Sequence, residues 1–403
     1  MTEPILVTGA GIVSAIGIGK EETLASLLAG RTGIRPMKYL HSCHSELPVG
    51  EVQLSNEEMM RRMGVDADPG LTRTALMGRI ALGEALEQAG LEGKALRKVH
   101  LISATTVGGM DRREAFHAQE KSCDRQHAMI AVHNCGDSTE MIARHFGEFA
   151  SLSTVSTACS SATNAIITGA NMLRCGLADV VVCGGSESLS LFHLNGFNTL
   201  MILDQQPCRP FDRDRAGLNL GEGAAYIVLE TAASASRRGA RPLCRLSGYG
   251  NACDAFHQTA SSDNGEGAFR AMDEALRMAG LKPADIQYVN AHGTGTPNND
   301  ESETHALRRV FGSELPPVSS TKSFTGHTTS ASGSIEAVIC MLAMQHRFLP
   351  ANMNWTTPMD NGITPVTYVP DAAPAELTHV LSNAFGFGGN DSALILSKCD
   401  CQP

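Results

Sequence analysis

Short apolar runs typical of strands alternate with helical segments along the chain, and this order excludes an all-α or an all-β fold. The runs Pro4–Thr8 and Val99–Ser103 have the length and composition of strands. Ala75–Ala89 lies between them and repeats apolar residues at helical spacing. Further strands are predicted at Ala178–Cys183 and Tyr226–Glu230. Strands separated by helices predict α/β layers around a central sheet.

A second series of the same kind starts near residue 243. A chain of 403 residues is too long for one simple core, and no long linker interrupts it. We therefore expect an internal duplication, with halves at 1–243 and 244–403 packed as one body. In each half the first strand is expected to enter a glycine turn, at Gly9–Gly11 and at Gly248–Gly250. The second half comprises predicted strands at 245–250, 286–290 and 392–397 and predicted helices at 267–279 and 334–345.

The composition fits a globular protein and argues against several functional classes. Hydrophobic residues make up 42% of the chain and charged residues 18%, as in ordinary globular proteins. The net charge of −10 argues against a nucleic-acid binder. We find neither an apolar run of about 18 residues nor a basic and then apolar N-terminus, so we expect no membrane span and no signal peptide. The 12 cysteines are scattered without a CxxC pair, so we expect reduced thiols in the cytoplasm.

Two motifs that suggest a cofactor or a metal are incomplete. The Gly9–Gly11 segment resembles the start of a dinucleotide-binding fingerprint, but Ser14 stands where the third glycine belongs. His41, Cys43 and His44 lie too close in sequence to share one metal, and a fourth ligand is not evident. We therefore expect neither a metal nor an organic cofactor.

Cys159 lies in the segment STACSSATNAI, where a β-prone run meets a helix. Val155–Ala158 is β-prone, and from Ala162 to Leu173 small and apolar residues recur at intervals of three and four, with Gly176 just past the expected end of the helix. The free amides and the positive end of this helix would favour a thiolate and could stabilise an oxyanion. The alternative is that Cys159 only packs in the core, as free cysteines usually do.

Polar residues in glycine-rich surroundings elsewhere in the chain favour the active-site interpretation of Cys159. The segment NAHGTGT places His292 after a predicted strand, together with Thr294 and Thr296. The segment STKSFTGH places Lys322 and His327 on either side of a glycine turn. Glycines and threonines of this kind bring backbone and hydroxyl donors close to a reacting centre.

Two further features need a role or a partner. Glu336 lies in an otherwise apolar helix, where a charge needs a partner, and Lys322 is a plausible one. In the segment SNAFGFGGND, glycines alternate with Phe385 and Phe387 before the last strand. The backbone amides of such a loop can face a ligand while a phenyl ring closes a pocket.

Together these segments resemble the β-ketoacyl-acyl-carrier-protein synthases of the thiolase superfamily, particularly the synthase II type. The motifs TACSSA, NAHGTGT, STKSFTGH and SNAFGFGG carry the resemblance, which runs essentially end to end. It implies an α/β, thiolase-like duplicated αβαβα layered fold. It also implies an acyltransferase, a 3-oxoacyl-[acyl-carrier-protein] synthase that elongates fatty acids. Such an enzyme joins malonyl-carrier protein to an enzyme-bound acyl chain by decarboxylative Claisen condensation, with no cofactor.

The resemblance also implies roles for the catalytic residues. Cys159 would carry the acyl chain as a thioester, while His292 and His327 would hydrogen-bond the malonyl thioester oxygen and stabilise the enolate. The amides of Cys159 and Phe387 would form the oxyanion hole. Phe387 would also act as the gate between the acyl pocket and the malonyl site.

Supporting roles follow from the same resemblance. Lys322, counted among the catalytic residues, would order the histidine region with Glu336 rather than take protons. Thr294 and Thr296 would support the site. The expected partners are an acyl carrier protein, acyl-loaded or malonyl-loaded, and a second copy of the chain in a homodimer. The residues expected to line the acyl pocket are Val107 and Met110, and those expected to bind the acidic carrier are Arg61, Arg62, Arg209 and Arg213.

Some residues depart from the pattern of the family and keep other functions open. Asn390-Asp391 stands where Thr-Asn is common, and Asn164 stands where many elongating enzymes have histidine. The alternatives are a ketosynthase of a polyketide or aryl polyene pathway, or a non-catalytic partner subunit that sets chain length. A thiolase acting on coenzyme A thioesters is a further alternative. Retention of Cys159, His292 and His327 argues against the non-catalytic subunit.

Overall fold

The computed structural model describes residues 3–399, apart from 67, 69, 119–133 and 371–372. Ten strands form one path through a mixed sheet in the order β4-β3-β5-β6-β1-β7-β11-β10-β8-β9, and β2 pairs with β1. The strands are β1 (Ile5–Ser14), β2 (Gly17–Ile18), β3 (Val99–Ala104), β4 (Ser151–Val155), β5 (Val180–Glu187), β6 (Gly223–Thr231), β7 (Cys244–Cys253), β8 (Tyr288–Asn290), β9 (Val318–Ser319), β10 (His379–Gly386) and β11 (Asn390–Ser397).

Helices cover both faces of this sheet. None of the helices in the described part of the chain is long and apolar enough to cross a membrane. The α-helices are α1 (Lys20–Leu28), α2 (Asn56–Arg62), α3 (Arg73–Ala89), α4 (Met110–Ala118), α6 (Cys135–Arg144), α7 (Ser161–Arg174), α8 (Leu191–Thr199), α9 (Ala232–Arg238), α10 (Glu266–Ala279), α11 (Pro297–Phe311), α12 (Lys322–Thr325) and α13 (Ser332–His346).

The two halves of the sheet repeat one topology. From the centre outward, the first half runs β1, β6, β5, β3, β4, and the second runs β7, β11, β10, β8, β9. With β2 left out, these are the first, fifth, fourth, second and third strands of each half in chain order. The pairing directions also match, because the first three strands are antiparallel neighbours and the outer ones pair in parallel. The two halves meet where β1 pairs antiparallel with β7.

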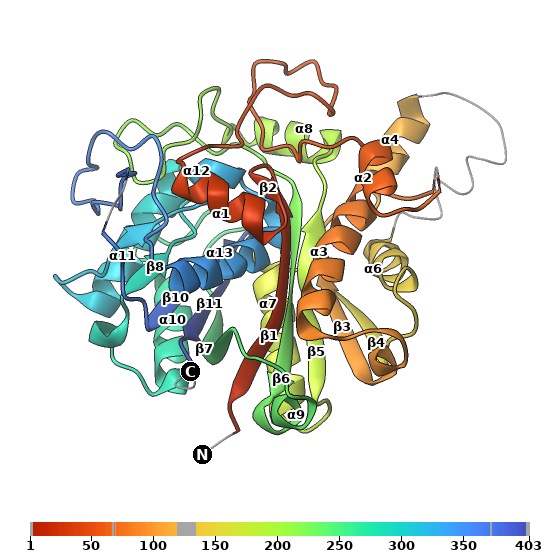
Figure 1. Cartoon of the computed structure of the whole chain (residues 1–403). Coiled ribbons are helices and arrows are strands. Elements are labelled where there is room, and N and C mark those ends of the chain that lie inside the picture. The colour runs from red at the N-terminus through yellow and green to blue at the C-terminus, as the bar shows by residue number, and fades with distance from the viewer. Residues whose placement is uncertain (1–2, 67, 69, 119–133, 371–372, 400–403) are drawn as a thin grey trace.

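Three hydrophobic clusters separate the layers. The central cluster contains α7 and α13, which lie between the two half-sheets, and the flanking clusters lie under α3 and under α10 with α11. Figure 1 shows α7 and α13 in the middle, with α3 and α6 on one side and α10 and α11 on the other. Because α13 is apolar on nearly every side, it can be buried along its whole length. The arrangement is the α/β layered fold expected from the sequence.

The expected glycine turns at the ends of the first strand of each half are wrong. Strand β1 continues to Ser14 and β7 to Cys253, so Gly9, Gly11 and Gly248–Gly250 lie within strands. A Cβ at Gly11 would lie 2.0 Å from the Ala81 carbonyl oxygen of α3, and one at Gly250 would lie 2.1 Å from the Ala271 carbonyl oxygen of α10. These glycines let a helix backbone approach the strand closely.

Candidate active site

Cys159 lies at a sharp bend between β4 and α7. Ala158 has φ 53°, a left-handed conformation that is uncommon for a residue with a side chain. Ser161 holds this bend, because its hydroxyl accepts from the Thr157 amide at 2.8 Å and lies 2.5 Å from the Ala158 carbonyl oxygen, to which it donates. Cys159 is 5% exposed, and the Phe387 backbone amide donates to its sulfur.

The Cys159 thiol is neutral at rest. Burial raises its pKa to about 11, and the opposing influences of the Lys322 charge and the Phe387 amide are smaller. Burial of the sulfur thus opposes the thiolate that the helix end is expected to favour. The positive end of a helix acts over about one turn, whereas the loss of water around a buried sulfur disfavours the anion more strongly.

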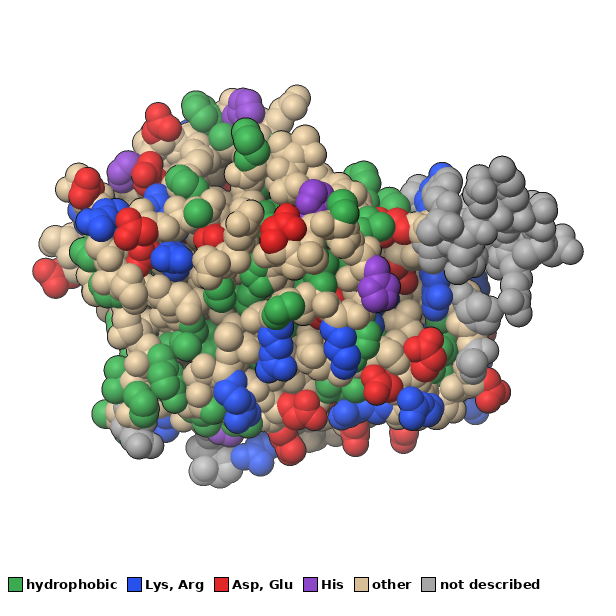
Figure 2. Space-filling view, turned by 90° about the horizontal axis from the view of Figure 1, so that it is seen from above, with side chains coloured by type: hydrophobic (Ala, Val, Ile, Leu, Met, Phe, Trp, Pro, Cys, Tyr) green, Lys and Arg blue, Asp and Glu red, His purple; other side chains and the backbone are tan. Residues whose placement is uncertain are grey.

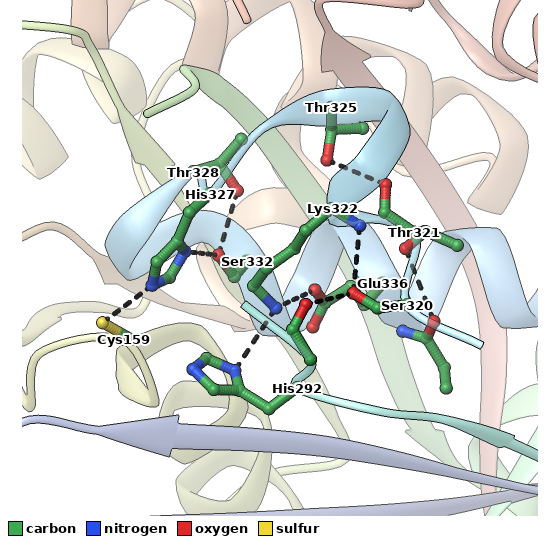
Figure 3. A network of polar contacts seen from close by, with 12 residues as sticks. Cys159, His292, Ser320, Thr321, Lys322, Thr325, His327, Thr328, Ser332 and Glu336 are labelled. Carbon is green, nitrogen blue, oxygen red and sulfur yellow. Dashed lines mark hydrogen bonds and ion pairs between the residues drawn. The ribbon is translucent and has the colours of Figure 1, made fainter. Parts of the chain in front are cut away.

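The two predicted histidines lie beside the thiol (Figure 3). His327 Nε2 is 3.1 Å from Cys159 Sγ, and its Nδ1 is 3.0 Å from Ser332 Oγ. The rings of His292 and His327 are nearly perpendicular, with centroids 5.3 Å apart. Burial first, and the Lys322 charge second, place the pKa of both histidines well below the usual value. Both imidazoles are therefore neutral.

Lys322 connects His292 to Glu336. Lys322 Nζ lies 2.5 Å from Glu336 Oε1 and 3.3 Å from His292 Nδ1, and the lysine is 1% exposed. Burial raises the pKa of Glu336 to about 7, against the attraction of Lys322. An ammonium group donates and never accepts, so His292 Nδ1 must accept and the proton of this neutral ring is on Nε2.

A pocket of about 240 Å³ opens in front of these groups. Cys159, His292 and His327 line it, and so do Thr294 and Thr296, whose hydroxyls are 2.9 Å apart. The other lining residues are Phe197, Ile202, Leu218, Thr259, Ala260, Ser261, Pro297, Asn298, Asn299, Phe385, Gly386, Phe387, Gly388 and Gly389. Val107 does not line this pocket; it is buried, and its backbone amide lies 3.3 Å from Glu187 Oε1.

The pocket includes neither Val107 nor Met110, so their assignment to an acyl pocket stays a prediction. The described residues contain no group of three His, Cys, Asp or Glu side chains that could hold a metal ion. Of the arginines expected to bind a carrier, Arg61, Arg62 and Arg213 are exposed and Arg209 is half-buried. Figure 2 shows the face seen from above, where basic and acidic side chains are interspersed.

Several residues that shape the site were not identified from the sequence. Glu303 of α11 accepts from the amides of His292 and Gly293 at 2.9 and 2.7 Å and so fixes the backbone of the histidine. Phe197 of α8 stacks on Phe387, with ring centroids 5.8 Å apart. Asp300 and Glu303 are three residues apart and both buried on α11, and this helical spacing was the one available signal for Glu303.

A cluster of amides connects the bend at Cys159 to the turn that holds Phe387. Asn390 Oδ1 accepts from Ser160 Oγ at 2.8 Å, from Asn164 Nδ2 at 2.6 Å and from Asn251 Nδ2 at 2.9 Å. Both asparagines at the positions that depart from the family pattern, Asn164 and Asn390, therefore contact each other. Their contact fixes the start of α7 against the β10–β11 turn.

Comparison with known proteins agrees with the fold and the geometry of a thiolase-type condensing enzyme. Residues 2–235 match the family described as "Beta-ketoacyl synthase, N-terminal domain", and residues 243–356 match "Beta-ketoacyl synthase, C-terminal domain". The chain therefore belongs to the β-ketoacyl synthase family of acyltransferase-type condensing enzymes.

Relatives at similar identity belong to two kinds of pathway. The chain is 33% identical to a putative polyketide β-ketoacyl synthase 1 of Streptomyces cyaneus and 31% identical to 3-oxoacyl-[acyl-carrier-protein] synthase 2 of Staphylococcus aureus, over 98% of both chains in each case. Among solved structures, the ishigamide ketosynthase/chain length factor has a TM-score of 0.91 and 32% identity, covering 99% of this chain and 100% of that one. A ketosynthase, ApeO, in complex with its chain length factor from Xenorhabdus doucetiae has a TM-score of 0.84 and 28% identity, covering 98% of each.

Proposed function

We propose that the protein joins a malonyl unit to an acyl chain held on Cys159, with both substrates delivered as thioesters on an acyl carrier protein. The observation that supports this proposal is the 3.1 Å contact between His327 Nε2 and Cys159 Sγ, in a pocket that His292 also lines. A nucleophile, its base and a second imidazole therefore face one space. A non-catalytic chain-length subunit would not need all three.

In the acyl-transfer step, Cys159 attacks the carbonyl carbon of the acyl-carrier thioester. Because the thiol is neutral at rest, it must lose its proton as the sulfur attacks, and His327 Nε2 is within reach to accept it. The amides of Cys159 and Phe387 hold the oxyanion of the tetrahedral intermediate. Collapse of this intermediate expels the carrier thiolate, which takes the proton back from His327.

In the condensation step, malonyl-carrier loses CO₂ and leaves an enolate. His292 donates from Nε2 to the thioester oxygen of this enolate, since Lys322 occupies its Nδ1. His327 can donate to the same oxygen once the proton of its neutral ring is on Nε2, with Ser332 Oγ then donating to Nδ1. The enolate carbon then attacks the acyl carbonyl on Cys159 and expels the sulfur as a thiolate. The 3-oxoacyl-carrier leaves the site, and the thiolate takes up a proton from water to restore the neutral thiol.

Two pathways fit this chemistry. Fatty acid elongation is one, supported by the 31% identity to 3-oxoacyl-[acyl-carrier-protein] synthase 2. A polyketide or aryl polyene pathway is the second, supported by the 33% identity to a putative polyketide β-ketoacyl synthase 1 and by the ishigamide ketosynthase/chain length factor as a structural neighbour. The mass of the products distinguishes fatty acid elongation from an unreduced polyketide, because an elongating enzyme adds one malonyl unit before the 3-oxo group is reduced, whereas successive condensations leave several keto groups. A polyene enzyme, whose 3-oxo group is also reduced in each round, is distinguished by a higher rate with unsaturated than with saturated acyl-carriers.

A second subunit fits the outer edge of β4. This strand pairs with β3 on one side, and Ser151–Ser153, which include Leu152 at 39% exposure, face outward. Exposed strand edges pair readily with another strand. A second copy of this chain is the proposed partner, and a chain length factor, as in the ApeO structure, is the alternative.

The experiment that tests the function uses the full chain with malonyl-carrier and a panel of acyl-carriers. We expect intact-mass spectrometry to detect the acyl group on the wild-type chain and 3-oxoacyl products on the carrier. Cys159→Ala should give neither. Acylation of that variant at the wild-type level would disprove the assignment of Cys159.

A further inference from the structure

Two carboxyl groups meet at the start of α10. Asp391 of β11 is 3% exposed, and Asp254 follows the end of β7. A Cβ at Gly267 would lie 2.2 Å from Asp391 Oδ2 and 2.8 Å from Asp254 Cβ. Both acidic side chains therefore occupy the same small space against the backbone of α10.

The hydrogen bonds of these two carboxyl groups are unequal. Asp254 accepts from the Ser262 amide and from Ser262 Oγ, both at 2.7 Å, and from the Gly267 amide at 3.0 Å. Within the described part of the chain, no donor is in hydrogen-bond contact with the Asp391 carboxyl. Hydrogen-bond donors stabilise the ionised form of a carboxyl group. Here these donors bind Asp254 and not Asp391.

The charged groups that face Asp391 are also acidic. They are Asp254 from the loop after β7 and Glu303 from α11, and together with burial, the largest cause, they raise the pKa of Asp391 to about 8. Asp391 is therefore a neutral carboxylic acid at pH 7, with no basic side chain to balance a negative charge there.

Two segments that line the pocket are hydrogen-bonded to each other beside this pair of carboxyl groups. The Asp254 amide donates to the Gly389 carbonyl at 2.7 Å, and the Gly388 amide donates to the Gln258 carbonyl at 2.8 Å. These bonds join the 254–261 loop, which contributes Thr259 to the pocket, to the turn that contributes Phe387. A movement at Asp254 must therefore reach both walls.

We propose that Asp391 is a positioning residue that, in its neutral acid form, keeps the 254–261 loop docked against the Phe387 turn beside Cys159. Ionisation places two carboxylates in one space with no counter-cation, and the exposed loop is the element that can move to separate them. An asparagine at this position would have the same shape without the titration, so the aspartate makes the wall of the pocket sensitive to pH. The proposal uses the proposed function only for its activity measurement.

The first experiment measures condensation rate between pH 6 and 9.5 for the wild type, Asp391→Asn and Asp263→Asn. Asp263 is an exposed carboxylate on the same segment and serves as the matched control. We expect the wild-type and Asp263→Asn rates to fall about tenfold for each pH unit above 8, as expected when one ionisation removes the working form. Asp391→Asn should keep above pH 8 the rate that it has at pH 8. An identical fall in Asp391→Asn would overturn the proposal.

Two measurements that need no turnover separate this inference from the proposed function. In the wild type, infrared difference spectra between pH 6 and 9.5 should show the loss of one band of a protonated carboxylic acid. This band should be absent in Asp391→Asn. In Asp254→Asn it should disappear at a lower pH than in the wild type. Hydrogen exchange of residues 254–266 at pH 9 should be faster in the wild type than in Asp391→Asn. If both hold while no variant condenses substrates, the proposed function fails and the role of Asp391 stands. If the band is missing at pH 6, Asp391 is ionised and the proposal fails.

Discussion

His327 Nε2 lies 3.1 Å from Cys159 Sγ, although the two residues are 168 positions apart in the chain. The contact is possible because each residue precedes one of the two buried central helices, Cys159 at α7 and His327 at α13. A Cβ at Gly333 of α13 would lie 1.9 Å from Thr163 Oγ1 of α7, so the helices touch near their first turns. The reacting groups are thus brought together by the packing of these two helices.

Replacing Cys159 with glutamine should separate the two steps of the reaction. A neutral amide can stand in for the acyl thioester, so His292 and His327 should still receive malonyl-carrier and release CO₂. We expect decarboxylation to continue while acyl transfer is abolished, measured as acetyl-carrier formation by mass spectrometry. Loss of decarboxylation in a folded Cys159→Gln variant would contradict the roles proposed for the histidines.

Replacing Lys322 with alanine should destabilise the protein and disturb His292. Glu336 would remain buried without its counter-charge, and breaking a buried pair in this way costs about 3–5 kcal/mol. Urea unfolding measures this loss. The double variant Lys322→Met/Glu336→Gln removes both charges and should recover part of the stability, whereas equal losses in the single and double variants would show that the pair is not coupled.

The stability of the protein should fall as pH rises from about 5 to 8, partly through Glu303. Burial raises its pKa from 4.5 to about 7, so between these values the folded state binds more protons than the unfolded state. The free energy of unfolding then decreases with rising pH, by at most about 3 kcal/mol for a shift of this size. Urea midpoints at pH 5 and 8 measure the slope, which should be smaller in Glu303→Gln; an unchanged slope would contradict the raised pKa.

Two glycine-to-alanine substitutions should change the stability of the fold in opposite directions. Gly11→Ala in β1 places a Cβ 2.0 Å from a backbone oxygen of α3, and we expect a loss of about 1–3 kcal/mol or more. Gly83→Ala is the matched control, because its Cβ would meet the nearest atom at 3.6 Å and alanine favours a helix by about 1 kcal/mol. Thermal unfolding compares them, and equal melting temperatures would refute the close packing of α3 on β1.

Charge reversal at Arg61 and Arg62 tests the expected carrier surface. Arg61→Glu/Arg62→Glu should raise the KM for acyl-carrier about tenfold at low salt, because an acidic partner is repelled. The difference should shrink at 0.5 M salt, where charges are screened beyond a few ångströms. Arg237→Glu on α9, at the opposite end of the molecule from α2 (Figure 1), is the control. If the double variant and the wild type have equal KM values for acyl-carrier, Arg61 and Arg62 do not belong to the carrier-binding surface.

The sequence was sufficient to predict the layered fold and the grouping of Cys159, His292, Lys322 and His327, but not Glu303 or Phe197. Local signals carried those predictions, since strand and helix periodicity and the motifs around Cys159, His292 and Lys322 are each contained in short segments. The errors involve long-range packing. Gly11 was predicted to form a turn because nothing nearby in sequence shows that α3 will lie against it.

The ionisation of Cys159 could not be predicted for a similar reason. Its helix is visible in the sequence, but the depth at which the sulfur is buried depends on elements far away in the chain. The close contact between Asp391 and Asp254 could not be predicted from the sequence either, because 136 positions lie between these two aspartates. Both properties depend on tertiary neighbours that the linear pattern does not reveal.

The repeated strand order of the two halves has a consequence for any attempt to divide or recombine this molecule. One repeat supplies the sulfur and the other supplies both imidazoles, so a fragment that ends at residue 243 is chemically incomplete however well it folds. A chimaera must transfer the seam between α7 and α13 intact, because a swapped repeat that shifts either helix by one ångström would separate the sulfur from the imidazole that receives its proton.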